Sequence, residues 1–207
     1  MTQPQPDHRR ERILTAALQQ AAHGYGGVRI RAVADAAGVP LSSVYYYFPS
    51  KDGLLLECLH SWLSDFTTYD VADNGRGTEP HQRLLSTVES LTTQLELTPF
   101  LAEAAARAYL NATGTAARKA ELVRDKLIQI FADVMHHHQP AQPDHNHQVA
   151  ALVADVWIAN ILAITQNRTT ALDLCRRLEH ALAAIRENAR PQNQAPKPSA
   201  RPSIRGA

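Results

Sequence analysis

The chain is poor in the residues that several familiar classes of protein need. Its 207 residues include only two cysteines, Cys58 and Cys175, which lie far apart in the sequence. This excludes a secreted framework of disulfides, and we expect a reduced, cytoplasmic chain. The sequence has no uninterrupted run of about 18 apolar residues, and its charged beginning lacks an apolar stretch. We therefore expect no membrane span and no secretory signal.

Signatures of catalysis are also missing. The sequence has no nucleophile elbow, phosphate-binding glycine loop, paired-cysteine zinc pattern or zincin helix. Histidines occupy positions 136–138, and His145 and His147 follow; imidazoles of this kind can bind zinc. Consecutive histidines diverge around a helix, however, and two prolines separate the two groups. We expect a solvated loop there, with no metal and no cofactor, and we predict that the protein is not an enzyme.

Charge is nearly balanced overall but unevenly placed. The formal net charge is +1. Residues 1–51 carry six basic and three acidic side chains, and residues 190–207 carry four basic side chains and no acidic one. The middle of the chain is therefore acidic. A basic N-terminal part followed by an acidic middle suits binding to DNA, because only the basic part then meets the phosphates.

Residues 28–51 have the pattern of a helix-turn-helix. The first helix is marked by apolar residues spaced i, i+3, i+4 and i+7, namely Ile30, Val33, Ala34 and Ala37. Gly38 follows, and glycine ends helices because it adopts the left-handed backbone without a steric penalty. A second helix begins at Ser42 and turns Val44 and Phe48 inward. Two helices joined by such a turn form the unit whose second helix enters the major groove of DNA.

The outward face of the second helix favours DNA binding over a plain helical hairpin, which stays the alternative. Three consecutive tyrosines cannot all be buried, because neighbouring residues diverge by about 100° around a helix. We expect Tyr45 to pack partly beneath the helix, and Tyr46 and Tyr47 to present their hydroxyls to the DNA. The predicted DNA contacts are Arg29, Arg31, Ser42, Ser43, Tyr45, Tyr46, Tyr47 and Lys51.

The same residues resemble a known family. Ala34-x-x-Ala37-Gly38-Val39 and Tyr45-x-Tyr47-Phe48-Pro49-Ser50-Lys51 are similar to the signature of the tetracycline-repressor (TetR) family of regulators, over about residues 9–55. The resemblance implies a three-helix DNA-binding domain followed by an all-helical domain that binds a ligand and dimerises. Two positions depart from the family pattern. Arg29 stands where a threonine commonly caps the second helix, and Leu41 replaces a frequently polar residue at the start of the recognition helix.

Helical periodicity continues to about residue 188, and no segment alternates with period two. We predict an all-α fold with a three-helix helix-turn-helix domain at 9–52 and a helical ligand-binding and dimerisation domain at 53–189. Residues 1–8 and a basic, proline-rich tail at 190–207 are expected to be disordered. Helices are expected at about 9–23, 30–37, from 42, and at 51–69, 80–97, 99–112, 116–138, 145–166 and 170–188.

The last two predicted helices are strongly apolar. Their stripes fit either the core of one chain or a two-fold four-helix bundle between two chains. A dimer would also place two recognition helices on half-sites about one helical turn, or a multiple of it, apart. Together with the family resemblance, this predicts a homodimer on a palindromic double-stranded DNA operator.

Aromatic and leucine side chains of the second domain are candidates for lining an apolar effector cavity, although each of them fits a simple core position as well. They are Trp62, Phe66, Leu91, Leu95, Leu110, Phe131 and Trp157.

A second resemblance bears on the effector. Pro99-Phe-Leu-x-Glu103-Ala-x-x-Arg107-Ala-Tyr109 and Asp155-Val-Trp157-x-x-Asn160-x-Leu162-Ala163 are similar to the regulatory domain of TetR-family repressors of steroid catabolism, over much of residues 98–180. This implies a repressor that a steroid-derived acyl-CoA thioester releases from DNA. A fatty acyl-CoA or a hydrophobic drug fits the same composition. A helical enzyme or adaptor is the alternative class.

Overall fold

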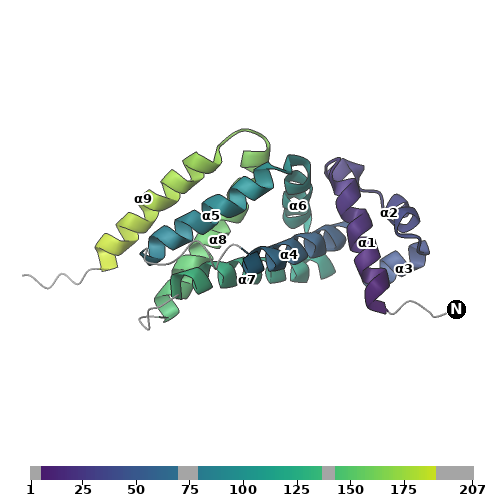
Figure 1. The fold of residues 1–207 in the computed structure, drawn as a ribbon, viewed down its shortest axis with the longest axis horizontal. Helices are drawn as coiled ribbons and strands as arrows, with labels where there is room; N and C mark the ends of the chain where they lie inside the picture. The colour runs from purple at the N-terminus through teal and green to yellow at the C-terminus, as the bar shows by residue number, and fades with distance from the viewer. Residues whose placement is uncertain (1–5, 70–78, 137–142, 190–207) are drawn as a thin grey trace, which may run out of the picture.

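A computed structural model describes residues 6–69, 79–136 and 143–189. These residues form α-helices and one 3-10 turn, with no strand among them, so the predicted all-α fold is confirmed. The molecule is elongated, with α1 to α3 at one end and α5 and α9 toward the other (Figure 1). The elements are α1 Pro6–Ala21, η1 Tyr25–Gly27, α2 Ile30–Ala37, α3 Leu41–Tyr47, α4 Lys51–Tyr69, α5 Pro80–Glu96, α6 Pro99–Asn111, α7 Thr115–His136, α8 Pro143–Thr165 and α9 Ala171–Ala189.

The first helix begins earlier than expected. Helix α1 starts at Pro6 and ends at Ala21, so residues 6–8 are helical and not disordered. Proline is well placed in the first turn, because the N–H that it lacks would have no partner inside the helix. Residues 1–5 and the tail at 190–207 lie outside the described residues, as do His137 and His138.

Helices α1, α2 and α3 pack into a small three-helix unit around Ile13, Val33 and Val44, which are fully buried. Gly38 ends α2 in the left-handed conformation, with φ at 61°, as its position predicted. The N–H of Val39 then donates to the carbonyl of Ala34 at 3.0 Å, which satisfies one of the last carbonyls of α2. This closed turn fixes the angle at which α3 leaves α2.

The second domain is built from α4 to α9. Helix α7 packs against α4, α5 and α8, and α9 packs mainly against α5. The buried guanidinium of Arg83 in α5 donates to the carbonyls of Val134 at 2.7 Å and Met135 at 3.1 Å. Because the last carbonyls of a helix have no partner within it, Arg83 holds the end of α7 in place.

Helix α8 requires a correction to the sequence analysis. By length and mean hydropathy alone, residues 144–165 are apolar enough to cross a membrane. The search for an uninterrupted apolar run missed them because Asp155 and Asn160 interrupt the run. In the structure α8 packs against α6 and α7, and Asp155 accepts hydrogen bonds from Arg124 at 2.6 and 2.8 Å. One face of α8 therefore belongs to the protein core, whereas Leu152, elsewhere on this helix, stays exposed.

Candidate nucleic-acid interface and effector pocket

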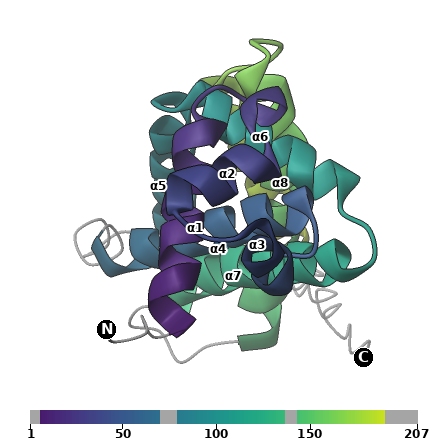
Figure 2. The same ribbon diagram turned by 90° about the vertical axis from the view of Figure 1, so that its right-hand side faces the viewer.

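Helix α3, the predicted recognition helix, lies at the free end of the molecule, in front of α1 and α4 (Figure 2). Val44 is fully buried, while Tyr45 and Tyr46 are 50% and 81% exposed. The rings of Tyr46 and Tyr47 meet edge to face, with 5.2 Å between their centroids. The exposed hydroxyls lie where a DNA backbone or groove would be met if α3 entered the major groove.

The tyrosines divide differently from the expectation. Tyr47 packs against the core and is half-buried, whereas Tyr45 is exposed. The reason is the helical angle: with Val44 pointing inward, Tyr45 lies about 100° away but Tyr47 only about 60° away on the other side. Tyr47 therefore serves the packing of α3 as well as its surface.

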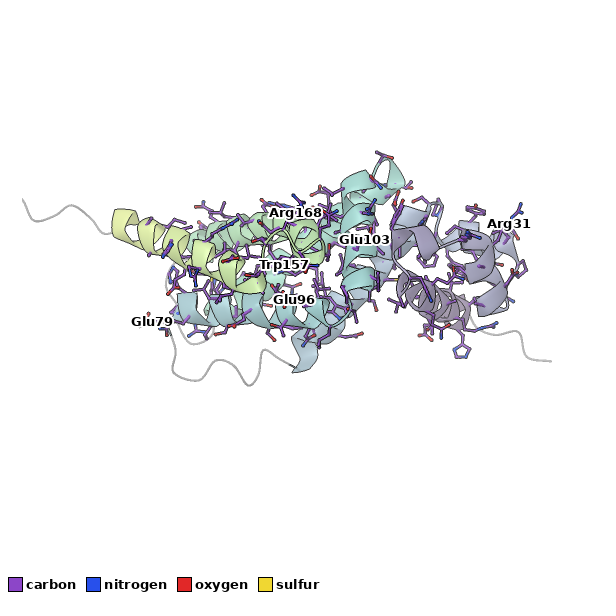
Figure 3. All side chains as sticks on the ribbon, turned by 90° about the horizontal axis from the view of Figure 1, so that it is seen from above. Arg31, Glu79, Glu96, Glu103, Trp157 and Arg168 are labelled. Atoms are coloured by element: carbon purple, nitrogen blue, oxygen red, sulfur yellow. The ribbon has the colours of Figure 1, made fainter. Side chains whose placement is uncertain are left out.

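The remaining predicted contacts surround α3. Arg29, Arg31 and Ser42 are exposed, and Ser43 is half-buried; Arg31 lies at the tip of the domain (Figure 3). Arg29 is the N-cap residue of α2 and makes no capping hydrogen bond with its side chain, as expected for arginine at that position. Its N–H instead donates to Oε1 of Gln20 at 3.1 Å.

Lys51 has a partner that the sequence did not suggest. Its ammonium group donates to the backbone carbonyl of Tyr25 and lies 3.7 Å from the centroid of the Tyr25 ring. Partial burial lowers the pKa of Lys51, while the nearby carboxylates of Asp52 and Glu103 act in the opposite sense. Lys51 thus joins the start of α4 to the turn before α2, and these contacts occupy the ammonium group that the sequence analysis assigned to DNA.

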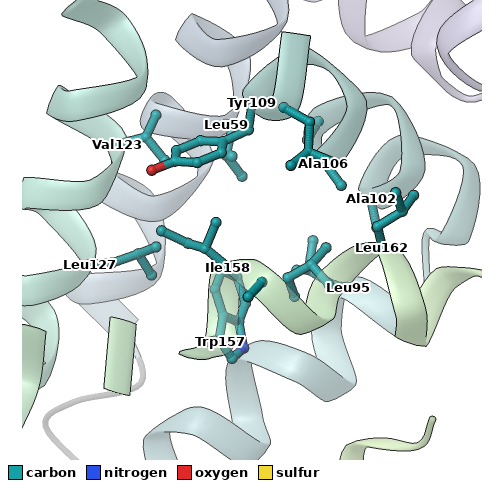
Figure 4. Close-up of a pocket in the computed structure, with 14 residues that line it drawn as sticks. Leu59, Leu95, Ala102, Ala106, Tyr109, Val123, Leu127, Trp157, Ile158 and Leu162 are labelled. Atoms are coloured by element: carbon teal, nitrogen blue, oxygen red, sulfur yellow. The ribbon is translucent and has the colours of Figure 1, made fainter. Parts of the chain in front are cut away.

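An apolar pocket lies between α4, α5, α6, α7 and α8 (Figure 4). Three of the predicted ligand residues line it: Leu95, Leu110 and Trp157. The indole N–H of Trp157 donates to the hydroxyl of Thr92 at 3.0 Å, which fixes the ring in the pocket wall. The cavity measures about 40 Å³, well below the roughly 300–1,000 Å³ of a typical ligand pocket. It must expand before a lipid can enter.

The other predicted ligand residues lie elsewhere. Leu91 and Phe131 are fully buried in the core. Trp62 and Phe66 of α4 lie side by side outside the pocket lining, with their rings tilted by 35° and their centroids 6.1 Å apart. Of the wall formed by α6, sequence analysis named only Leu110 and missed the other lining side chains, which are mostly alanines. The signal was present as three small residues at helical spacing, because small side chains leave space beside a helix. These lining residues are Ala102, Ala105 and Ala106, followed by Tyr109.

A larger and more polar cavity of about 370 Å³ adjoins the apolar pocket. The two share Leu95 and Ile161 in their walls. Its polar lining consists of threonine side chains, Glu96 at the end of α5, and Asn167 in the turn between α8 and α9. An apolar chamber beside a polar one suits a ligand with a hydrophobic body and a polar end.

The described residues hold no group of three or more histidine, cysteine, aspartate or glutamate side chains that could bind a metal. Cys58 and Cys175 are both free thiols. Burial raises the pKa of the Cys58 thiol to about 12, so this thiol stays protonated and unreactive.

A helix-turn-helix unit with exposed tyrosines and arginines, joined to a helical domain with an apolar pocket, defines a DNA-binding regulator with a second, ligand-type domain. Residues 13–58 match the family of bacterial regulatory proteins named tetR, and residues 77–185 match the tetracyclin repressor-like C-terminal domain. The chain belongs to the TetR family of transcriptional regulators.

Similar proteins and solved structures agree with this family assignment. The chain is 35% identical to the HTH-type transcriptional repressor KstR of Mycobacterium tuberculosis over 178 residues, which cover 86% of this chain and 80% of that protein. It is also 35% identical to KstR of Rhodococcus jostii, over 83% of this chain and 79% of that one. A TetR regulator from a Rhodococcus species has a TM-score of 0.76 at 21% identity, covering 90% of this chain and all of the other.

A further solved structure has the same fold with a ligand bound. The regulator FadR of Bacillus subtilis, in complex with stearoyl-CoA, has a TM-score of 0.61 at 14% identity, over 83% of this chain and 96% of that one. Because the relatives are repressors and the fold is that of TetR regulators, the protein is a regulator and not an enzyme.

Proposed function

We propose that the protein is a ligand-responsive transcriptional repressor, cytoplasmic like the DNA that it binds. It binds a palindromic operator as a homodimer and is released by an apolar effector, a steroid-derived acyl-CoA. The observation that carries this proposal is the apolar pocket between α4, α5, α6, α7 and α8, in a chain that is 35% identical to KstR over most of its length.

The dimer forms through α8 and α9. Leu152 on α8 and Leu172 on α9 are 47% and 63% exposed in the single chain, so each of the two helices leaves a large apolar side chain uncovered. By contrast Leu178 and Leu182 on α9 are buried, because α9 packs against α5. The apolar stripe of α9 therefore divides between the core of one chain and the surface that we assign to the second copy.

The small size of the pocket implies that an effector favours a state different from the one in the structure. An effector cannot occupy about 40 Å³, so it binds a state in which α6, α7 and α8 have moved apart. A ligand shifts an equilibrium only toward the state that it binds more tightly. If the expanded state mismatches the spacing of the two operator half-sites, the effector weakens DNA binding by the same factor by which DNA weakens effector binding.

The second candidate effector is a fatty acyl-CoA. The fold shared with FadR in complex with stearoyl-CoA supports it, because that fold accommodates a long acyl chain. A hydrophobic drug is the third possibility that an apolar lining of this kind accepts.

The test is operator binding in the presence of an effector panel. Fluorescence anisotropy with DNA from upstream of the gene, at fixed salt, would measure the operator Kd alone and with sterol acyl-CoAs, fatty acyl-CoAs, the free acids, and a cationic aromatic drug. We expect the sterol acyl-CoAs to raise the operator Kd by at least about tenfold, within the usual range for allosteric coupling. A shift with fatty acyl-CoA or drug alone would reject the steroid assignment, and absence of specific DNA binding would reject the repressor.

A further inference from the structure

Helix α6 contacts the apolar pocket with one face and the DNA-binding domain with another. Ala102 and Ala106 on one face line the apolar pocket. Glu103 and Arg107 follow them by one residue each, and one residue turns a helix by about 100°, so these two side chains leave the pocket side. They form an ion pair four residues apart on the same helix.

Glu103 reaches the DNA-binding domain directly. Its Oε2 atom accepts a hydrogen bond from the backbone N–H of Tyr25 at 2.9 Å, across 78 residues of sequence. Figure 3 shows Glu103 on α6, between the pocket region around Trp157 and the DNA-binding domain that carries Arg31. Tyr25 opens η1, the turn that leads into α2 of the helix-turn-helix.

The turn is shaped to receive this carboxylate. Gly24 has φ at +79°, and a Cβ atom on it would stand 3.2 Å from Oε2 of Glu103. A side chain at position 24 would therefore crowd the contact as well as strain the backbone. The absence of a side chain lets the carboxylate approach the N–H of Tyr25 closely.

Tyr25 is also held from the opposite side. Its hydroxyl donates to Oδ1 of Asp52 at 2.7 Å, and its carbonyl accepts from Lys51. One residue thus joins three elements: the turn before α2, the start of α4, and α6.

We propose that Glu103 is the positioning residue through which the effector pocket controls the orientation of the helix-turn-helix. This inference rests on the proposed function. An effector that expands the pocket pushes on Ala102 and Ala106, and a rigid helix carries Glu103 along. A hydrogen bond of 2.9 Å is lost by about 3.6 Å, so a displacement of less than 1 Å either pulls the turn with α6 or releases it.

The experiment compares wild type with Glu103→Ala, Glu103→Gln and the control Glu89→Ala, which removes an exposed acid from α5. Hydrogen–deuterium exchange of the full-length protein without effector gives the first readout. We expect residues 25–37 to exchange faster in Glu103→Ala, because the Tyr25 N–H loses its acceptor, and to stay unchanged in Glu89→Ala. Equal exchange in all four proteins would overturn the contact as a domain link.

The second readout is the ratio of operator Kd values with and without the sterol acyl-CoA of the panel. Glu103→Ala should still bind the operator, and it should still bind the effector, as measured by quenching of tryptophan fluorescence. The ratio of its operator Kd values with and without effector should, however, fall about tenfold relative to wild type. Glu103→Gln keeps an oxygen acceptor and should retain the ratio within about threefold. If Glu103→Ala keeps the wild-type ratio of operator Kd values, this inference is overturned. If the wild type responds to no member of the panel, the proposed function is overturned instead. In that case the exchange measurement still tests whether Glu103 links the two domains.

Discussion

The recognition face can be tested by separating neutral from charged contacts with DNA. Tyr46 is 81% exposed, so replacing it with phenylalanine removes one hydroxyl and almost no packing. We expect the stability to change by less than about 0.5 kcal/mol. A hydrogen bond from this hydroxyl to a phosphate is worth about 1.5 kcal/mol. Because each subunit of the proposed dimer contributes one, operator affinity should fall roughly a hundredfold.

The salt dependence distinguishes this loss from the loss of a cation. Each neutralised phosphate contributes about −0.9 to the slope of log K against log salt. Tyr46→Phe should leave the slope unchanged, because tyrosine is neutral. Arg31→Ala, at an exposed position, removes one cation from each subunit of the proposed dimer and should flatten the slope by about 1.8.

Lys51 should behave differently from both. Its ammonium group already binds the carbonyl and ring of Tyr25, so we expect Lys51→Met to leave the slope nearly unchanged and to act on stability. Loss of a charge-assisted hydrogen bond and a cation–π contact costs about 2 kcal/mol together, which lowers Tm by about 4–8 °C for a chain of this size. Anisotropy titrations at four salt concentrations and thermal unfolding by circular dichroism measure both quantities. If Tyr46→Phe and Arg31→Ala both bind like wild type at every salt concentration, α3 is not the recognition helix as we describe it.

Other variants test the remaining contacts. Burial acts to raise the pKa of Glu57, but Lys119 and Arg10 outweigh it and lower the pKa. Wild type should therefore lose stability as the pH falls below about 5, and Glu57→Gln should show a flatter loss in urea titrations between about pH 5 and pH 3. Ala106→Leu places three extra carbons beside a cavity of about 40 Å³. This overpacking should lower Tm by a few degrees. It should also abolish the effector response while operator binding persists. Leu172→Asp should give folded monomers in light scattering, whereas Leu178→Asp should unfold the chain, because its carboxylate would be buried within one subunit; a folded dimer for Leu172→Asp would contradict the assigned surface.

Local pattern predicted the helices well because each one carries its own start, stop and apolar face. Gly38 ends α2 in the left-handed conformation, and proline opens α5 and α6, as the sequence indicated. Residues 13–58 could be assigned to the TetR family because their motif has a fixed spacing within one short unit. Exposure of Tyr46 followed from the same periodicity.

Contacts between distant segments could not be predicted in this way. The apolar residues of the second domain all looked alike in sequence, yet Phe131 fills the core while Trp157 lines the pocket. Pocket size likewise depends on how closely α6 approaches its neighbours, and alanine permits a range of distances. Burial alone does not say which helix a side chain meets.

The amino-acid sequence by itself determined the elements, the position of the turn before α3 and the class of regulator, because these depend on residues within a few turns of one another. Only the tertiary structure decided that Lys51 binds Tyr25 and that Glu103 reaches the same residue across 78 positions. It also decided that Leu178 belongs to the subunit core while Leu172 stays exposed. The physical reason is that a polar or apolar group gains free energy from whatever partner the packing of the helices brings to it, and that packing is a property of the whole chain.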